Sequence, residues 1–394
     1  MMLYNHDGSF FRVTSPDMKS INTDSKNYNL DLMSLTVTES DGTMINGDLM
    51  FRDQDDFYAK VLRPGVRLEI EWGINNTGLT PVSRGIGEVM VTSPGGAGGP
   101  GGDKTYRCSF VAIGWRGDNA RRWWYTGTKK NVVAETMTRL GVVSQEINFE
   151  RMNDAITSEI PLSQYESDFR FLVRLSHENR CALRMGYTKR GLAASMVDYS
   201  LVTASGYVGN VTGSESSLKL EYGTSEANVL SYTWTDDAMD SANGQGVKIA
   251  WVDGKPQIYK YVVEDEKVVA YRLNEELLAE RFKAEGAQSG FQLMLDYVNQ
   301  TDFNSKTVQQ YFTREVLTTA PQGSGIKVSA KMMGDPLLTN GMVASFGKGF
   351  PDRIGAKDKT WWVKSATHSI TPQGYTTDLE IWDALAETPT GMRL

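Results

Sequence analysis

Residues 361–382 read WWVKSATHSITPQGYTTDLEIW, and the hydrophobic pattern of this stretch determines the class of fold that we predict. One face of its second segment carries Tyr375, Thr377, Leu379 and Ile381. Alternation with period two is typical of a half-buried β-strand. The PQG tripeptide at 372–374 is a turn signal between the two segments. The stretch therefore predicts an antiparallel β-hairpin.

The same period-two pattern occurs near the N-terminus, from about residue 28 to 115. The segment VRLEIEWG at 66–73 places four apolar side chains on one face, namely Val66, Leu68, Ile70 and Trp72. TYRCSF at 105–110 repeats the alternation. Strands with short turns over this length predict a small barrel or sandwich. After Pro321 the pattern returns, so two β units bracket the middle of the chain.

The middle of the chain changes to helical periodicity. The segment DFRFLVRLSHE at 168–178 predicts a helix with Ser167 as its N-cap and Asn179 as a left-handed turn after it. NVVAETMTRLG at 131–141 predicts a second helix, capped by Asn131 and ended by Gly141. Cys181, Leu183 and Met185 then alternate as in a strand. The middle is therefore predicted to be a mixed α/β unit.

Composition restricts the class of protein. The 394 residues are 40% hydrophobic and 23% charged, which is typical of a soluble globular protein with two or three domains. The net charge of −7 argues against a general nucleic-acid-binding surface. We expect no membrane segment and no secretory signal, and folding in a cytoplasm. Cys108 and Cys181 are expected to be small core residues.

The glycine-rich segment SPGGAGGPGGDK at 93–104 raises the question of a nucleotide site. Gly96, Gly98 and Gly101 match the spacing G-x-G-x-x-G. A dinucleotide fingerprint needs a helix after the glycines, whereas the residues that follow alternate as in a strand. We therefore interpret 93–102 as the tip of a hairpin.

A search for catalytic or metal-binding groups identifies no site, so no catalytic, cofactor-binding or metal-ligating residue is predicted, and no cofactor. The histidines at 6, 177 and 368 are far apart, and His177 and Cys181 are separated by a predicted helix end. The acidic runs with Asp53, Asp55 and Asp56 and with Asp236, Asp237 and Asp240 do not follow the order of a calcium loop. The run Arg121, Arg122, Trp123 and Trp124 favours domain packing or a partner interface.

Three segments together resemble a known family. LSQYESDFRFLVRLSHENRCALRMG at 162–186 contains the matching residues Glu166, Ser167, Asp168, Phe171, Leu172, Arg174 and Leu175. GDPLLTNGMVASF at 334–346 contributes Gly334, Asp335, Pro336 and Gly341, and the hairpin at 361–382 contributes Trp362, Val363, His368, Gly374, Tyr375, Thr377 and Leu379. KVLRPGVRLEIEWG at 60–73 adds a first-barrel segment. These residues resemble tail baseplate hub proteins, the family of phage late-control gene D proteins and the hub part of type VI secretion spike proteins.

The resemblance implies a β-dominated, mixed α+β fold in which two tube-like β-barrel domains bracket an α/β middle region. The implied ranges are a first tube-like barrel at 1–115, the α/β middle domain at 116–205, strands joining the second barrel at 206–252, a helical or irregular insertion at 253–325 and the second tube-like barrel at 326–388. Within the insertion, 274–287 and 305–317 are predicted to form amphipathic helices.

The function implied by the resemblance is structural, not enzymatic. Such a hub of a phage tail or contractile injection system is a homotrimer with a pseudo-six-fold ring. It adapts a hexameric tail tube protein or tube initiator above to a trimeric spike protein below, touches other baseplate proteins, and encloses a channel through which DNA or cargo passes without specific binding. The chain carries no spike repeats, so we expect a separate spike. The expected location is the virion tail baseplate, after folding and assembly in the host cytoplasm.

Two other functions stay open at this point. A tail-associated cell-wall hydrolase would need a pair of carboxylates, and no pattern singles out a pair among the 48 acidic residues. A receptor- or glycan-binding tail module would use exposed aromatic residues.

Overall fold

The computed structural model describes residues 9–14, 31–74, 82–97, 104–112, 118–149, 152–156, 162–179, 181–188, 191–198, 217–236, 246–252, 255–264, 267–272, 326–355, 361–371 and 373–383. The predicted helices at 274–287 and 305–317 lie outside these ranges, as do His6 and the tip of the glycine segment at 98–103.

The first six strands lie side by side in one sheet, which we call the first half. They are β1 (Ser9–Thr14), β2 (Leu32–Ser40), β3 (Asn46–Arg52), β4 (Arg67–Ile74), β5 (Val82–Ala97) and β6 (Thr105–Ala112). Their order across the sheet is β1-β4-β5-β6-β3-β2. The short helix α2 (Phe57–Val61) connects β3 to β4. The alternation at 66–73 is confirmed, because Leu68, Ile70 and Trp72 of β4 are buried.

The last six strands of the large sheet, which we call the second half, repeat this arrangement. They are β14 (Ser217–Leu220), β15 (Val229–Asp236), β19 (Ile326–Met333), β20 (Val343–Phe346), β21 (Trp361–Thr371) and β22 (Gly374–Asp383). Their order is β14-β20-β21-β22-β19-β15, so in both halves the strands lie in the sequence first, fourth, fifth, sixth, third, second. The predicted hairpin at 361–382 is β21–β22. One difference is that β14 pairs parallel to β20, whereas β1 pairs antiparallel to β4.

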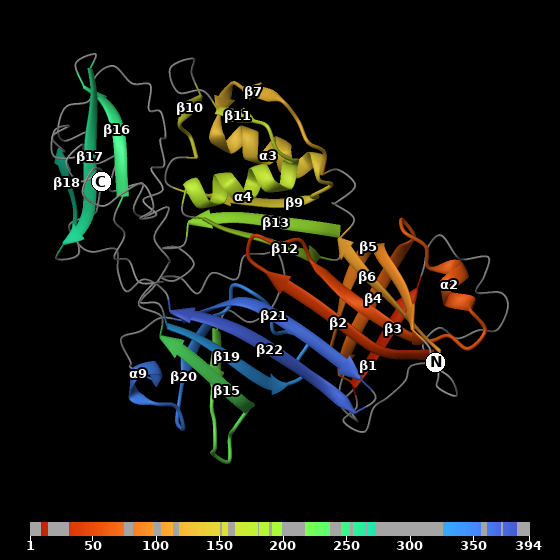
Figure 1. The fold of residues 1–394 in the computed structure, drawn as a ribbon. Helices are drawn as coiled ribbons and strands as arrows, with labels where there is room; N and C mark the ends of the chain where they lie inside the picture. Colours follow the sequence, from red (N-terminus) through yellow and green to blue (C-terminus); the bar gives the residue numbers. More distant parts are fainter. Residues whose placement is uncertain are drawn as a thin grey trace, which may run out of the picture.

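The two halves join into a single twelve-stranded sheet. The joint is the antiparallel pairing of β2 with β21, from Leu35 opposite Ile370 to Ser40 opposite Ser365. Figure 1 shows the two halves meeting where β2 and β21 lie side by side. The β-dominated class is confirmed; the division into two closed barrels with the ranges given above stays a prediction.

The middle of the chain forms the α/β unit. It contains a three-stranded sheet of β9 (Ser144–Asn148), β12 (Cys181–Thr188) and β13 (Gly191–Asp198), and the helices α3 (Lys129–Arg139) and α4 (Asp168–Glu178). Four short strands accompany them: β7 (Trp123–Tyr125), β8 (Gly127–Thr128), β10 (Ala155–Ile156) and β11 (Leu162–Gln164). In Figure 1, β12 and β13 lie between these helices and the large sheet.

The α/β unit packs directly on the first half. Residues 181–186 of β12 and 192–197 of β13 are buried, so both faces of these strands are covered. The main-chain N–H of Gly42, next to β2, donates to the carbonyl of Leu183 at 2.8 Å. One hydrophobic core accordingly runs through the first half and the α/β unit, and a second core fills the second half.

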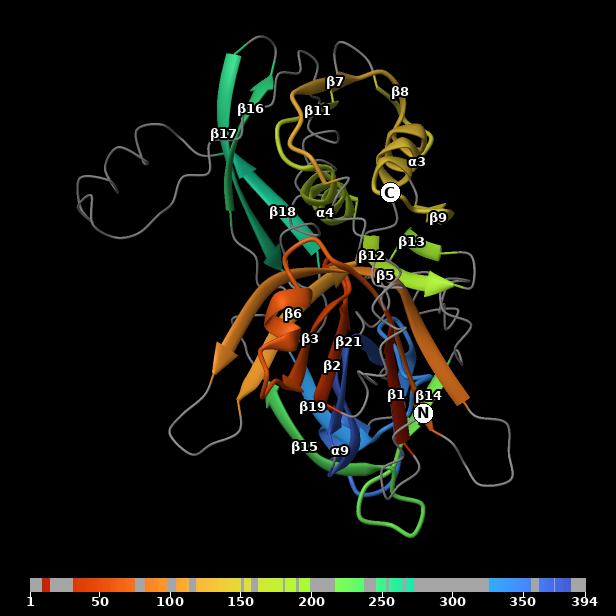
Figure 2. The same ribbon diagram turned by 90° about the vertical axis from the view of Figure 1, so that its right-hand side faces the viewer.

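A separate three-stranded sheet lies in sequence between β15 and β19 of the second half. It consists of β16 (Gly246–Val252), β17 (Lys255–Glu264) and β18 (Lys267–Arg272), drawn at the upper left of Figure 1 and again in Figure 2. Residues 255–264 and 267–272 fall in the range predicted to be a helical or irregular insertion, so that prediction is wrong for them. The runs YKYVV and KVVAYR are rich in β-branched and aromatic residues, which favour strands.

Three local predictions need correction. The N-cap of α3 is Thr128, whose hydroxyl accepts from the main-chain N–H of Asn131. Asn179 ends α4 with φ −108°, not in the left-handed conformation, whereas Ser167 is the N-cap of α4 as predicted. The hairpin tip was predicted at 93–102. It is shorter than that, because β5 continues through Ala97, which lies opposite Thr105. A strand, β6, does follow the glycines.

Candidate functional site

The Glu-Ser-Asp motif at 166–168 lies at the start of α4, and each residue has its own partner. The Ser167 hydroxyl caps the helix by accepting from the main-chain N–H of Arg170 at 3.4 Å. The Glu166 carboxylate accepts from Arg174 Nε at 2.6 Å, about two helical turns further along the chain. The motif thereby fixes where α4 begins and how it lies against β11.

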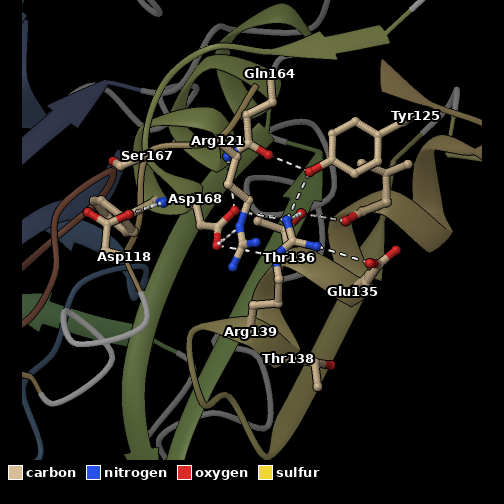
Figure 3. A network of polar contacts seen from close by, with 12 residues as sticks. Asp118, Arg121, Tyr125, Glu135, Thr136, Thr138, Arg139, Gln164, Ser167 and Asp168 are labelled. Atoms are coloured by element: carbon tan, nitrogen blue, oxygen red, sulfur yellow. Dashed lines mark hydrogen bonds and ion pairs between the residues drawn. The ribbon is translucent and has the colours of Figure 1, made fainter. Parts of the chain in front are cut away.

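Asp168 is the centre of a polar network (Figure 3). Its side chain is fully buried and accepts hydrogen bonds from Arg139 Nη2 at 2.8 Å, Arg121 Nε at 3.0 Å and Gln164 Nε2 at 2.9 Å. Burial alone would raise the pKa of Asp168, but the hydrogen bonds from Arg139, Gln164 and Arg121 outweigh it and lower the pKa below its ordinary value. The carboxylate is therefore held as an anion.

The rest of the network connects the two helices to the short strands. Arg139 Nη2 also donates to the Tyr125 hydroxyl at 2.9 Å, and the Tyr125 hydroxyl is hydrogen-bonded to Gln164 Oε1. These residues belong to α3, α4, β7 and β11. A carboxylate with a lowered pKa, enclosed by two guanidinium groups, is a poor general base near neutral pH. The network therefore has a structural role. It connects α3, α4, β7 and β11, and we call it the brace.

An aromatic surface lies next to this brace, in β7 and just after β11. We define it as Trp124 and Tyr165, which are 61% and 60% exposed. Trp123 is 62% exposed, but it is adjacent to Trp124 in β7, so its side chain points to the opposite face of that strand. The rings of Trp124 and Tyr165 meet edge to face with centroids 6.3 Å apart. Of the neighbouring arginines predicted to share one interface, Arg121 turns inward to Asp168, while Arg122 is exposed. Large exposed aromatic side chains grouped on one surface are typical of an interaction site.

A second polar cluster, the three-way junction, lies where the α/β unit meets both halves of the large sheet. Asp41 follows β2, Arg184 belongs to β12, and Asn340 precedes β20. Asn340 Nδ2 donates to Asp41 Oδ1 at 3.0 Å, and Arg184 Nη1 donates to the Asn340 carbonyl at 3.4 Å. Sequence reasoning missed this cluster, because its members are up to 299 positions apart in the chain.

The electrostatics of the junction are unusual at Asp41. Its Oδ2 is buried and has no hydrogen-bond partner among the described residues. Burial raises the pKa of Asp41 to about 7, although Arg184, Asn340 and Lys364 act in the opposite direction. A group whose folded-state pKa is raised binds more protons when folded, so stability falls as the pH rises from about 4 to about 7.

We expect the substitution Asp41→Asn to remove this pH dependence. At pH 5 the wild type and the variant should unfold at similar temperatures, because Asp41 is then protonated. At pH 8 the variant should unfold at a higher temperature, since the wild type holds a buried carboxylate there. Thermal unfolding at both pH values measures this. Asp48→Asn is the control, and its effect on stability should be opposite. The hydrogen bonds from Arg107 and Ser109 outweigh the effect of burial and lower the pKa of Asp48. This variant should therefore be less stable than the wild type at pH 8. An Asp41→Asn variant that is less stable at pH 8 would contradict the assignment.

The structure separates the other candidate residues from one another. His177 is exposed near the end of α4, whereas Cys181 is buried in β12. His368 is buried, with Nδ1 2.7 Å from the Tyr375 hydroxyl and Nε2 3.0 Å from the Leu338 carbonyl. Cys108 is buried, and burial raises the pKa of its thiol to about 12. No dyad of nucleophile and base is formed by these described residues.

The acidic run near Asp53 has a structural role. The Asp53 carboxylate accepts from the main-chain N–H groups of Tyr58 at 2.9 Å and Ala59 at 3.0 Å, so it caps α2. Asp237 and Asp240 lie outside the described residues. Over the part of the chain that the structure describes, no cluster of three His, Cys, Asp or Glu residues could hold a metal ion, and no helix is long and apolar enough to span a membrane.

The face of the large sheet opposite its cores, which we call the polar face, is rich in hydroxyl and charged groups. Around the joint, the Thr38 and Thr367 hydroxyls lie 3.2 Å apart. Further out, Arg107 pairs with Asp48 at 2.8 Å, and Arg12 pairs with Glu71. Because these arginines are paired with carboxylates, they offer little free positive charge to a polyanion.

Comparisons with known proteins agree on the fold. No family model matches the sequence, and no curated protein matches it significantly. A 43 kDa tail protein of prophage MuSo2 from Shewanella oneidensis superimposes with a TM-score of 0.56 at 12% identity, covering 95% of this chain and 98% of that one. A tail protein from Neisseria meningitidis gives 0.55 at 12% identity, with 97% and 98% covered.

A third similar structure comes from a secretion system. The Escherichia coli protein c3393 is described as a component of the type VI secretion system with structural similarity to the T4 bacteriophage tail proteins gp27 and gp5. It gives a TM-score of 0.50 at 14% identity, covering 91% of this chain and 74% of that one. The resemblance seen in the sequence is thus confirmed at the level of the fold: the chain folds like phage-tail and related secretion-system proteins.

Proposed function

We propose that this chain is the structural baseplate hub of a phage tail or a related injection machine, with no catalytic activity of its own. The observation that carries the proposal is the repeated strand order in the two halves of one sheet. Three copies of a chain with two like halves present six like units around a ring. Such a ring adapts a six-fold tail tube on one side to a three-fold spike on the other.

Two further observations support a ring. The fold is shared with proteins of phage tails, and one fold neighbour is described as similar to gp27 and gp5. The large sheet has three terminal strands, β1, β14 and β15, among the described residues. Sheet edges left open in solution promote uncontrolled association, and closure into a ring removes them.

In this proposal the polar face lines the channel. The hydroxyl groups near the joint and the paired arginines further out let a polyanion pass without binding to the wall. The aromatic surface lies on the α/β unit, away from the large sheet, where it faces the other baseplate proteins. The protein then works in the virion tail baseplate after assembly in the host cytoplasm.

Assembly in the host tests this function. Deleting the gene should stop tail formation before the tube is added, and a wild-type copy should restore it, as judged by electron microscopy of lysates. Antibody labelling of complemented particles should locate the chain at the end of the tail. Complete tails in the deletion strain would contradict the hub assignment.

The aromatic surface favours a second candidate function, a glycan-binding tail module, because sugars stack on exposed aromatic rings. In that case the isolated protein should bind cell-surface glycans, and Trp124→Ser should abolish the binding without changing the unfolding temperature. Glycan binding that needs Trp124, together with normal tails in the deletion strain, would favour this candidate over the hub.

A further inference from the structure

Because the two halves repeat the same strand order, the internal joint has a counterpart: a second pair of strands that could join in the same way. In the joint, β2, the second strand of the first half, pairs with β21, the fifth strand of the second half. The corresponding strands are β15, the second strand of the second half, and β5, the fifth strand of the first half. These two strands are not paired with each other within the described chain.

The edge of β21 that forms the joint is divided between two partners. Its first residues, Trp361 and Trp362, pair with β20, and Ser365–Ile370 pair with β2. The fifth strand of the first half is divided in the same way. Residues 82–90 of β5 pair with β4, and Val91 is hydrogen-bonded to Gly65 and Val66. The last six residues of β5, 92–97, have no partner on that edge among the described strands.

The outer edge of β15 is suited to pairing with another strand. From Val229 to Thr235 it carries no charged side chain. Leu230 is 52% exposed and Trp234 is 39% exposed. Soluble proteins usually protect a sheet edge with charged residues, prolines or short strands, so a long uncharged edge with exposed apolar residues marks a pairing site.

We propose that β15 of one copy pairs antiparallel with residues 92–97 of β5 in the next copy. The contact repeats between chains the joint that β2 and β21 make within the chain. It is a head-to-tail contact, which closes a ring when the rotation at each contact is the same. The inference rests on the homo-oligomer of the proposed function and specifies which strands hold it together.

The internal joint also predicts the register. In β22 and β6, Asp378 and Ser109 occupy equivalent places, each four residues after the start of its strand at Gly374 or Thr105. Lys331 lies opposite Asp378 and Ser231 lies opposite Lys331, just as Asp48 lies opposite Ser109 and Thr36 opposite Asp48. Ser231 is therefore the counterpart of Thr36.

The partner position follows from the same comparison. Thr36 lies opposite Ser369 in the joint, and Ser369 lies opposite Thr376, two residues after the start of β22. On β5 the residue opposite Arg107, two residues after the start of β6, is Gly95. Ser231 of one copy should therefore lie opposite Gly95 of the next.

A disulfide between these positions tests the proposal. Ser231 is exposed, and a Cβ added at Gly95 would meet no atom within 4 Å, so both positions accept cysteine. The Ser231→Cys/Gly95→Cys protein, oxidised mildly at a concentration where the wild type is oligomeric or with its spike partner added, should give covalent dimers and trimers on a non-reducing gel. The native Cys108 and Cys181 are buried, so the wild type is the blank.

Two matched variants control the experiment. Thr36→Cys/Ser369→Cys spans the internal joint and should form an intrachain disulfide that leaves the chain monomeric on the gel. Ser231→Cys/Gly85→Cys uses a glycine of β5 that lies opposite Glu71 of β4, so it should give no covalent oligomer.

Each outcome separates the inference from the proposed function. Covalent trimers from the first pair alone support the β15–β5 contact. A trimer seen by native mass measurement without a cross-link, while the intrachain control forms, overturns the contact and leaves the hub proposal standing. Self-cross-linking of the single variant Ser231→Cys indicates a two-fold contact and overturns the inference. A monomer without a cross-link in the presence of the spike overturns both.

Discussion

Replacing Gly47 with alanine is expected to destabilise the protein by about 3 kcal/mol or more, the upper range for overpacking a well-packed site. Gly47 is buried in β3, opposite Val37 of β2. A Cβ at this position would lie 2.0 Å from the Thr36 carbonyl oxygen and 2.6 Å from the Phe110 ring. Because the nearer atom belongs to the backbone, β2 must move away from β3. Since β2 also forms the joint with β21, the substitution should lower the unfolding temperature and also weaken the pairing of β2 with β21.

Gly95→Ala is the matched control for this prediction. Gly95 lies in the same sheet and a Cβ there is unhindered, so its unfolding temperature should stay near that of the wild type. Chemical denaturation gives the free energies of unfolding of all three proteins. Equal stability of Gly47→Ala and Gly95→Ala would show that β2 and β3 approach each other less closely than described here.

Asp168→Asn should cost about 3 to 5 kcal/mol, the usual loss when one partner of a buried ion pair is removed. Asp168 is fully buried and holds Arg139 and Arg121. The amide leaves the partly buried Arg139 with only the exposed Glu135 as a counter-ion, and it replaces an acceptor by a donor that faces guanidinium N–H groups. The variant should unfold at a markedly lower temperature and lose the fixed position of the aromatic surface next to the brace.

Glu135→Gln is the control, because Glu135 pairs with the same Arg139 from an exposed position, at 3.1 Å. An exposed pair contributes less than about 1 kcal/mol, so this variant should resemble the wild type. The pH dependence gives a second test. The pKa of Asp168 is lowered in the folded state, so its contribution is present above its ordinary pKa and is lost as the pH falls through the lowered value. Equal effects of the two variants would contradict a buried network.

Local signals in the sequence were enough to predict the strands β4, β6, β12, β21 and β22, the helices of the α/β unit and the Ser167 cap, but not the strands β17 and β18. The alternation of β4 and β22 and the apolar stripe of α4 are properties of neighbouring residues, and neighbouring residues determine local structure. The cap of α3 was misplaced by three residues, because Thr128 and Asn131 are both good capping residues and only the geometry distinguishes them.

Contacts between distant segments could not be predicted in the same way. The joint pairs Thr38 with Thr367, and the three-way junction brings Asp41 to Asn340. The residues around each of these positions in the sequence do not indicate which distant residue it contacts. The repeat of strand order was also hidden, because it lies in how the strands are placed and not in a repeated sequence. The motif at 166–168 was recognised as a family signature, but its role as the start of a buried brace required the positions of Arg121 and Arg139.

In the proposed hub, three copies of this chain form a ring with six like units. Class averages of the purified protein in negative stain, alone and with its spike partner, test it most directly. We expect rings with three-fold symmetry, six lobes and an open centre, in at least the sample with the spike. Compact single copies in both samples would contradict it.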